Sequence, residues 1–197
     1  MKKLLRLPLL CILAGCVSAI KVESGERGIG ERLVFNIDGA WNQINAPGIG
    51  PAQVWTMEGL PVDQLLVYSG IKDGEAISAS GTTVAGDTGD TNRKTFNFRS
   101  TMQPDEIVSL FEGMLTRDGS TFKLGKLQPS TFGGGKGFHF DYSLTRKIDS
   151  VQLSGIGYGT VDKGQLFAII YLAPRLTFFP RHKAKVEQIA RSAKLKG

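Results

Sequence analysis

The stretch QLFAIIYLA, residues 165–173, decides the fold of this chain. Every residue from Leu166 to Ala173 is apolar or aromatic, so the stretch shows no alternation between a polar and an apolar face. A strand of this kind is stable only when both of its faces are covered. We therefore expect a central strand with a packing layer on each side.

Further β-rich segments precede this strand. Residues 32–37 alternate through Leu33, Phe35 and Ile37, and the turn at Asp38-Gly39 favours a hairpin with a second strand at 41–44. More strands are predicted at 53–57, 64–69, 94–99, 121–127, 137–145 and 151–161, with 75–79 as a short extension. Gly- and Thr-rich residues 80–92 predict a loop.

Two helices are predicted, at about 104–117 and 181–195. In the first, Pro104 suits the opening position, and Asp105 and Glu106 lie where the helix dipole favours acids. Its apolar residues recur at helical spacing, as do Val186, Ile189 and Ala190 in the second helix. Strands, a helix, four strands and a closing helix predict one α+β domain over 31–197, with a mostly antiparallel sheet packed with two helices.

The part of the chain from Pro104 onward resembles the PsbP-like sandwich fold, which is known from extrinsic subunits of the photosynthetic oxygen-evolving complex. The order of the elements carries the resemblance, together with the apolar strand 166–172, the short loop 174–180 and the closing helix. Members of this fold mostly bind or assemble other proteins, so the resemblance implies a binding domain. It transfers no residue role.

The N-terminus predicts where the protein resides. Lys2, Lys3 and Arg6 precede an apolar core at 7–13 that is too short to span a membrane. Leu13-Ala14-Gly15-Cys16 then resembles the lipobox of bacterial lipoprotein precursors. The resemblance implies a signal peptide at 1–15 that is cut before Cys16, a diacylglycerol on the Cys16 thiol and an N-acyl chain on its amine. We read 16–30 as the lipidated cysteine followed by a tether.

By the same resemblance, Val17 favours the outer membrane, facing the periplasm, because an Asp at that position tends to retain enterobacterial lipoproteins in the inner membrane. We expect no other cofactor and no metal, since the chain has only two Cys and two His. The formal net charge of +6 falls to +3 without the leader, and the C-terminal 23 residues alone carry +6. The remaining body is mildly acidic, so the charge pattern argues against a nucleic-acid partner.

The strand at 137–145 aligns His139, Asp141 and Ser143 on one face. These are the residue types of a nucleophile–base–orienter site, but same-face neighbours in a strand stand roughly 6.5–7 Å apart. No nucleophile-elbow motif accompanies them. The favoured interpretation is a solvated strand face, with ligand contact or a surface-tethered hydrolase as alternatives.

Two other groups are candidate ligand or partner surfaces. Gly155, Gly157 and Gly159 leave a bare strip on one strand face, which either receives packed rings or forms the floor of a groove for a small or lipidic ligand. The closing helix presents cations to solvent, to anionic headgroups or to an acidic partner. These cations are Arg181, Lys183, Lys185 and Arg191.

Two further motifs are read as connections. The triplet Asp87-Thr88-Gly89 matches the aspartic-protease tripeptide but lies in a Gly/Thr/Asp loop and occurs once. Residues 133–137 (GGGKG) lack the Ser or Thr that follows Lys in a phosphate-binding loop. Trp41 and Trp55 are expected in the core or as hairpin anchors. The leading hypothesis is a membrane-anchored envelope lipoprotein with a non-catalytic binding or assembly domain and a possible envelope protein as partner.

Overall fold

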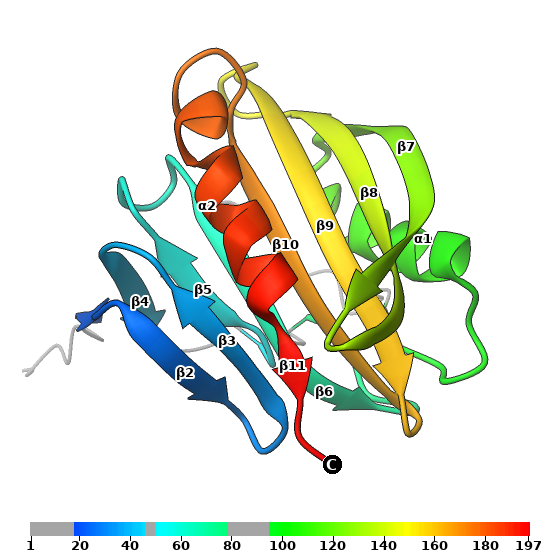
Figure 1. Cartoon of the computed structure of the whole chain (residues 1–197). Coiled ribbons are helices and arrows are strands. Elements are labelled where there is room, and N and C mark those ends of the chain that lie inside the picture. The colour runs from blue at the N-terminus through cyan, green and yellow to red at the C-terminus, as the bar shows by residue number, and fades with distance from the viewer. Residues whose placement is uncertain (1–17, 46–49, 79–94) are drawn as a thin grey trace, which may run out of the picture.

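The computed structural model describes residues 18–45, 50–78 and 95–197 (Figure 1). The predicted α+β class is confirmed: two helices pack on sheets in which every strand pair is antiparallel. The strands of the described residues are β1 (Ser18–Val22), β2 (Gly25–Ile29), β3 (Leu33–Ile37), β4 (Trp41–Asn45), β5 (Gln53–Thr56), β6 (Gln64–Lys72), β7 (Thr121–Phe132), β8 (Gly135–Thr145), β9 (Gln152–Asp162), β10 (Gln165–Pro174) and β11 (Lys194–Leu195). The helices are α1 (Pro104–Leu115) and α2 (Phe178–Ser192). Among these residues no helix is long and apolar enough to cross a membrane.

The apolar strand 165–173 lies inside the larger sheet, as its composition predicts. That sheet has eight strands in the order β1-β4-β5-β6-β10-β9-β8-β7. On β10, Ala168, Ile170 and Leu172 belong to the core on one side of the sheet, while Ile169 and Tyr171 belong to the core on the other. All five side chains are buried, so both faces of the strand are covered.

Helix α1 covers one face of the large sheet (Figure 1). The Gln103 side chain and the carboxylate of Glu106 cap the first turn reciprocally, and Pro104 follows the cap. Ile107, Val108 and Phe111 form the buried face of the helix. The predicted helix is confirmed, with its last α-helical residue at Leu115 rather than Arg117.

Helix α2 and a second sheet cover the opposite face. The second sheet has the order β11-β3-β2, and α2 lies between it and β9 and β10 (Figure 1). The predicted bounds 181–195 are shifted: α2 begins at Phe178, because Pro180 in the first turn removes no helical hydrogen bond. Ala193 is extended, and Lys194–Leu195 leave the helix to pair with β3.

The predicted tether over 16–30 is wrong for its described part. Ser18–Val22 pairs along its whole length with β4, and Gly25–Ile29 pairs with β3. Both segments show little apolar periodicity because β1 and β2 end their sheets, and four of the five residues of β1 are exposed. Within the described residues, the folded domain therefore includes Ser18–Ile29, which precede the predicted start at residue 31.

Two other sequence-based assignments need correction. The strands at 33–37 and 41–45 do not form a hairpin: β3 pairs with β2 and β11, while β4 pairs with β1 and β5. Of the segment predicted as a strand at 94–99, the described residues 95–99 contribute only an isolated bridge, between Asn97 and Ala76. The predicted loop at 80–92, with Asp87, lies outside the described residues.

Candidate functional site

The glycine strip of β9 is filled by aromatic rings. In the register between β8 and β9, Gly155, Gly157 and Gly159 lie opposite Tyr142, Phe140 and Phe138. A Cβ added at these glycines would approach a ring carbon of the facing residue to 2.1, 2.2 and 2.7 Å, respectively. The groove interpretation of the strip is therefore wrong, and the packing interpretation holds, because each ring occupies the space that a side chain would need.

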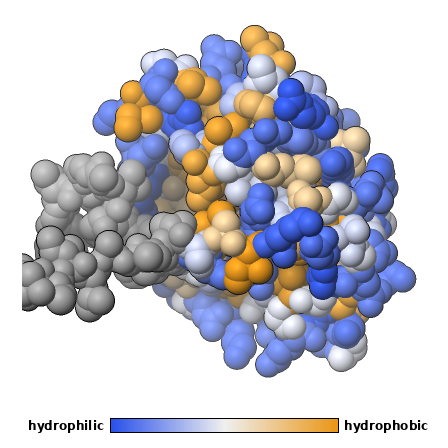
Figure 2. All heavy atoms as spheres, turned by 90° about the vertical axis from the view of Figure 1, so that its left-hand side faces the viewer, coloured by the Kyte–Doolittle hydropathy of each residue, from blue (hydrophilic) through white to orange (hydrophobic). Residues whose placement is uncertain are grey.

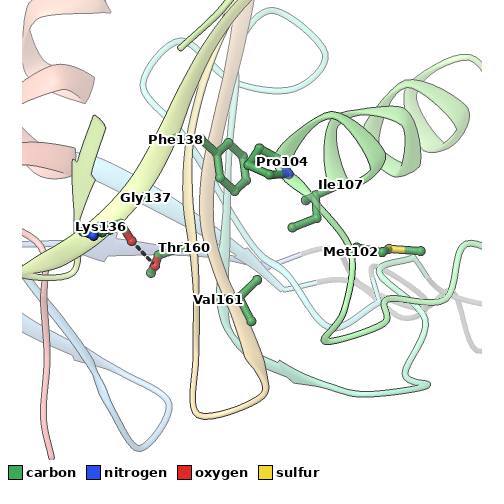
Figure 3. Close-up of a pocket in the computed structure, with 8 residues that line it drawn as sticks. All are labelled: Met102, Pro104, Ile107, Lys136, Gly137, Phe138, Thr160 and Val161. Carbon is green, nitrogen blue, oxygen red and sulfur yellow. Dashed lines mark hydrogen bonds between the residues drawn. The ribbon is translucent and has the colours of Figure 1, made fainter. Parts of the chain in front are cut away.

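A shallow cavity of about 220 Å³ lies beyond the end of this strip, between the start of α1 and the strands β8 and β9. Figure 3 shows Phe138 and Pro104 close together, with Ile107 next to Pro104 and Val161 further along the cavity. The polar groups that line the cavity include Thr160, whose hydroxyl donates to the carbonyl of Lys136. Ligand pockets usually enclose about 300–1,000 Å³, so this depression gives a small or lipidic carrier little support.

His139 and Asp141 lie on the sheet face that carries α2, because Phe138 and Phe140 point to the opposite core. The His139 Nε2 stands 3.6 Å from an Asp141 carboxylate oxygen, which is too long for a hydrogen bond. That nitrogen is buried and has no hydrogen-bond partner among the described residues, while Nδ1 lies 3.4 Å from the amide nitrogen of Gln128. Asp141 therefore does not orient the imidazole as a catalytic acid would.

The pKa of His139 also differs from what a general base in this row would need. Burial lowers the pKa of His139, and the Asp141 carboxylate only partly opposes that effect. Tyr158 lies over the imidazole with a ring-centroid distance of 4.5 Å, and burial raises its pKa to about 12. In the described part of the chain no hydrogen bond joins Ser143 to His139 or Asp141. The row is a strand face beside α2, not a triad.

Three of the four cations of α2 have a neighbouring acid within 4.0 Å. Arg181 lies 3.3 Å from the Glu58 carboxylate and over the Phe178 ring. Glu187 pairs with Lys183 at 3.6 Å and with Arg191 at 4.0 Å. Lys185 is half-buried and extends toward Gly39. The structure does not bring these four side chains together as one basic surface.

A buried acid orders the loop between β5 and β6. The Asp63 carboxylate accepts hydrogen bonds from the Thr56 hydroxyl and from the backbone N–H groups of Met57 and Glu58. Glu58 in turn bonds the buried His182 at 2.7 Å, and this contact lowers the pKa of Glu58. This network positions the loop against the first turns of α2.

One end of the large sheet carries a surface that the sequence analysis missed. The connections β5–β6, β8–β9 and β10–α2 meet there, because Thr145 pairs with Gln152, Leu153 with Pro174, and Leu172 with Gln64. Each connection exposes one large apolar side chain. These three, the apolar loop tips, are Leu60, Ile148 and Leu176, with exposed fractions of 42%, 85% and 87%.

The tips lie at the upper end of the molecule, where the connections after β8 and β10 turn over (Figure 1). Figure 2 shows hydrophobic side chains reaching the surface at that end. Each tip is a single apolar residue in a polar loop, so no periodicity in the sequence indicates it. A search for isolated large apolar residues between predicted strands is the only signal that would have found them.

Comparison with known proteins supports the fold and leaves the activity open. No protein-family model and no curated protein sequence matches the chain. The solution structure of cyanobacterial PsbP (CyanoP) from Synechocystis sp. PCC 6803 matches 94% of this chain and 97% of its own length, with a TM-score of 0.56 and 14% identity. The crystal structure of PA94 from Pseudomonas aeruginosa, a protein of unknown function, covers 85% of this chain at a TM-score of 0.38 and 16% identity. The first match confirms the PsbP-like fold.

Proposed function

We propose that this protein is a bacterial envelope lipoprotein, acylated on Cys16, whose domain binds or assembles other envelope components without catalysis. The observation that carries the proposal is the lipobox Leu13-Ala14-Gly15-Cys16 behind a basic and apolar leader. The PsbP-like fold supports a binding role by analogy alone, since one fold serves many functions. By resemblance, Val17 favours the outer membrane, with the domain in the periplasm.

The start of β1 determines how such an anchor would hold the domain. Ser18 is already paired with Asn45, so only residue 17 separates Cys16 from the folded sheet. Two residue steps span at most about 7 Å, which is close to the thickness of one headgroup layer. An acylated Cys16 would therefore hold the domain against the bilayer surface instead of extending it into the periplasm.

The acyl anchor is tested by labelling cells with radioactive palmitate and separating membranes from soluble proteins. The wild type should carry label and sediment with membranes, and Cys16→Ala should lose both properties. Cys11→Ala is the matched control, because Cys11 lies in the predicted leader and should be dispensable for both. A wild-type protein that is unlabelled and soluble would refute the anchor and leave a diffusible binding protein.

The binding role is tested separately in the acylated protein. Photo-crosslinking in intact cells from Asp141, on the half-buried strand face beside α2, should yield discrete adducts with an envelope protein. Ser143→Ala serves as the comparison for the hydrolase alternative. If the purified wild type hydrolyses ester or amide substrates and Ser143→Ala does not, the non-catalytic assignment is wrong.

A further inference from the structure

The apolar loop tips are held on a fixed platform. The Arg146 guanidinium donates to the carbonyl of Pro61 at 3.0 Å and to the carboxylate of Asp149 at 2.9 and 2.6 Å. One side chain thus joins the β5–β6 loop to the β8–β9 turn. The backbone N–H of Arg175 donates to the carbonyl of Gln152 at 2.9 Å, which joins the third loop to the same end. The exposed tips therefore keep a defined arrangement.

Two exposed cations stand beside the tips. Lys147 and Arg175 directly precede Ile148 and Leu176 in the sequence, and both are exposed. Within the described ranges, neither cation forms an ion pair. Of the acids nearby, Asp149 is engaged by Arg146, and Glu58 by Arg181 and His182. The exposed Asp118 directly precedes Gly119, beside which the Lys147 side chain extends. Two unpaired cations thus flank the two most exposed apolar side chains.

We propose that this end of the domain docks on an anionic lipid bilayer. Ile148 and Leu176 would enter the headgroup region, with Leu60 beside them, and Lys147 and Arg175 would contact anionic headgroups. Aliphatic side chains flanked by cations favour such a surface, because apolar burial and electrostatic attraction act together. A protein partner would instead favour a contiguous apolar centre with a polar rim, whereas each of these tips projects alone from its own loop.

This docking deepens the proposed function by adding a second membrane contact, but it does not depend on acylation of Cys16. It is tested with an environment-sensitive nitrobenzoxadiazole probe attached to Ile148→Cys or Leu176→Cys. The control site is Thr131→Cys, exposed at the opposite end of the sheet beside the β7–β8 turn. The acylated protein is reconstituted in vesicles of phosphatidylglycerol or of phosphatidylcholine that contain doxyl-labelled lipid quenchers.

We expect quenching of the probe at residues 148 and 176 in phosphatidylglycerol vesicles and none at residue 131. Lys147→Glu with Arg175→Glu should lower the quenching at 148 by more than about half, since each cation near an anionic surface is worth roughly a fivefold change in affinity. Lys126→Glu with Lys136→Glu, a matched charge reversal on β7 and β8, should leave it unchanged.

Absence of quenching at both tips in phosphatidylglycerol vesicles would overturn the docking proposal. Equal quenching in phosphatidylcholine would overturn its electrostatic part. Mass spectrometry of Cys16 in the same preparation reports acylation independently. If Cys16 is not acylated, the full chain with Cys11→Ala and Cys16→Ala is labelled and mixed with vesicles, and the 148 and 176 probes should still be quenched more than the 131 probe.

Discussion

Replacement of Gly157 by alanine tests how the large sheet is packed. A Cβ at this position would lie 2.2 and 2.4 Å from two ring carbons of Phe140 and 2.9 Å from the Cδ1 of Ile170. Real carbon atoms do not approach so closely, so the ring or the strand must move. Phe140 cannot move freely, because three other rings pack around it. Its ring centroid lies 6.3 Å from the centroids of Phe111 and Phe138 and 5.8 Å from the centroid of Tyr142.

The expected cost follows from this crowding. Overpacking a well-packed core typically costs about 1–3 kcal/mol, and a ring fixed on three sides places Gly157→Ala in the upper part of that range, at about 2–3 kcal/mol. For a domain of this size, 1 kcal/mol shifts the melting temperature by roughly 2–4 °C. We therefore expect a decrease of about 4–12 °C in Tm.

The assay is thermal and urea unfolding of Gly157→Ala beside Gly135→Ala. Gly135 is a matched control: it lies on the neighbouring strand β8, and no atom lies within 4 Å of an added Cβ. There the methyl group should leave stability unchanged or raise it by up to about 1 kcal/mol. Combining Gly157→Ala with Phe140→Leu should cost at least about 1 kcal/mol less than the sum of the single changes, because the smaller side chain makes room for the methyl group.

The packing explanation has a clear refutation. If Gly157→Ala melts together with the wild type and Gly135→Ala, the strip is open in solution. The groove for a small or lipidic ligand would then return as the better interpretation of Gly155, Gly157 and Gly159.

Two predictions concern the polar groups. Asp63→Asn should lower the free energy of unfolding in urea by about 2–3 kcal/mol, because the amide lacks the charge that strengthens the hydrogen bonds from Thr56, Met57 and Glu58, and its nitrogen cannot accept from the Met57 N–H as Oδ2 does; a loss below about 0.5 kcal/mol would contradict this. His139 should titrate below its ordinary pKa of about 6.5 in an NMR experiment, and Asp141→Asn should lower the pKa further by removing the opposing charge. Because the folded state then binds fewer protons than the unfolded state, His139 makes stability fall as the pH decreases below about 6.5, and a pKa above that value would show the sign to be wrong.

The central strand and both helices were predictable because their signals are local. An apolar run such as 166–173 and the helical spacing in 104–115 depend on neighbouring residues alone. The edge strand β1 was not predictable, because its partner Trp41–Asn45 lies about 20 residues away and its own side chains are exposed. The β3–β4 hairpin failed for a related reason: the turn at Asp38-Gly39 is real, but the two strands join different sheets.

The candidate site residues show the same difference between local signals and long-range contacts. His139, Asp141 and Ser143 were correctly placed on one strand face, since alternation fixes that, but only the structure gives the 3.6 Å separation that argues against a triad. The cations of α2 were visible in the sequence, whereas Glu58, the partner of Arg181, comes from a loop more than 120 residues earlier. A sequence shows which charges are present on a helix, but not which of them remain unpaired.

The same distinction explains why the two proposed membrane contacts differ in how they were found. A lipobox is a linear signal: the residues that define it are adjacent, so the sequence displays it in full. The apolar loop tips are a product of topology, because antiparallel pairing alone brings residues 60, 148 and 176 to one end of the sheet. Ser18 pairs with Asn45, at the end of β4 that lies away from the tips, because Asn42 pairs with Thr56. If both contacts act, the acyl chains hold the β1 edge of the sheet near the bilayer and the tips hold one end of the sheet there, and the two together restrict how the domain lies. The half-buried strand face around Asp141 would then have a defined orientation toward other envelope proteins, which a domain on a long tether would lack.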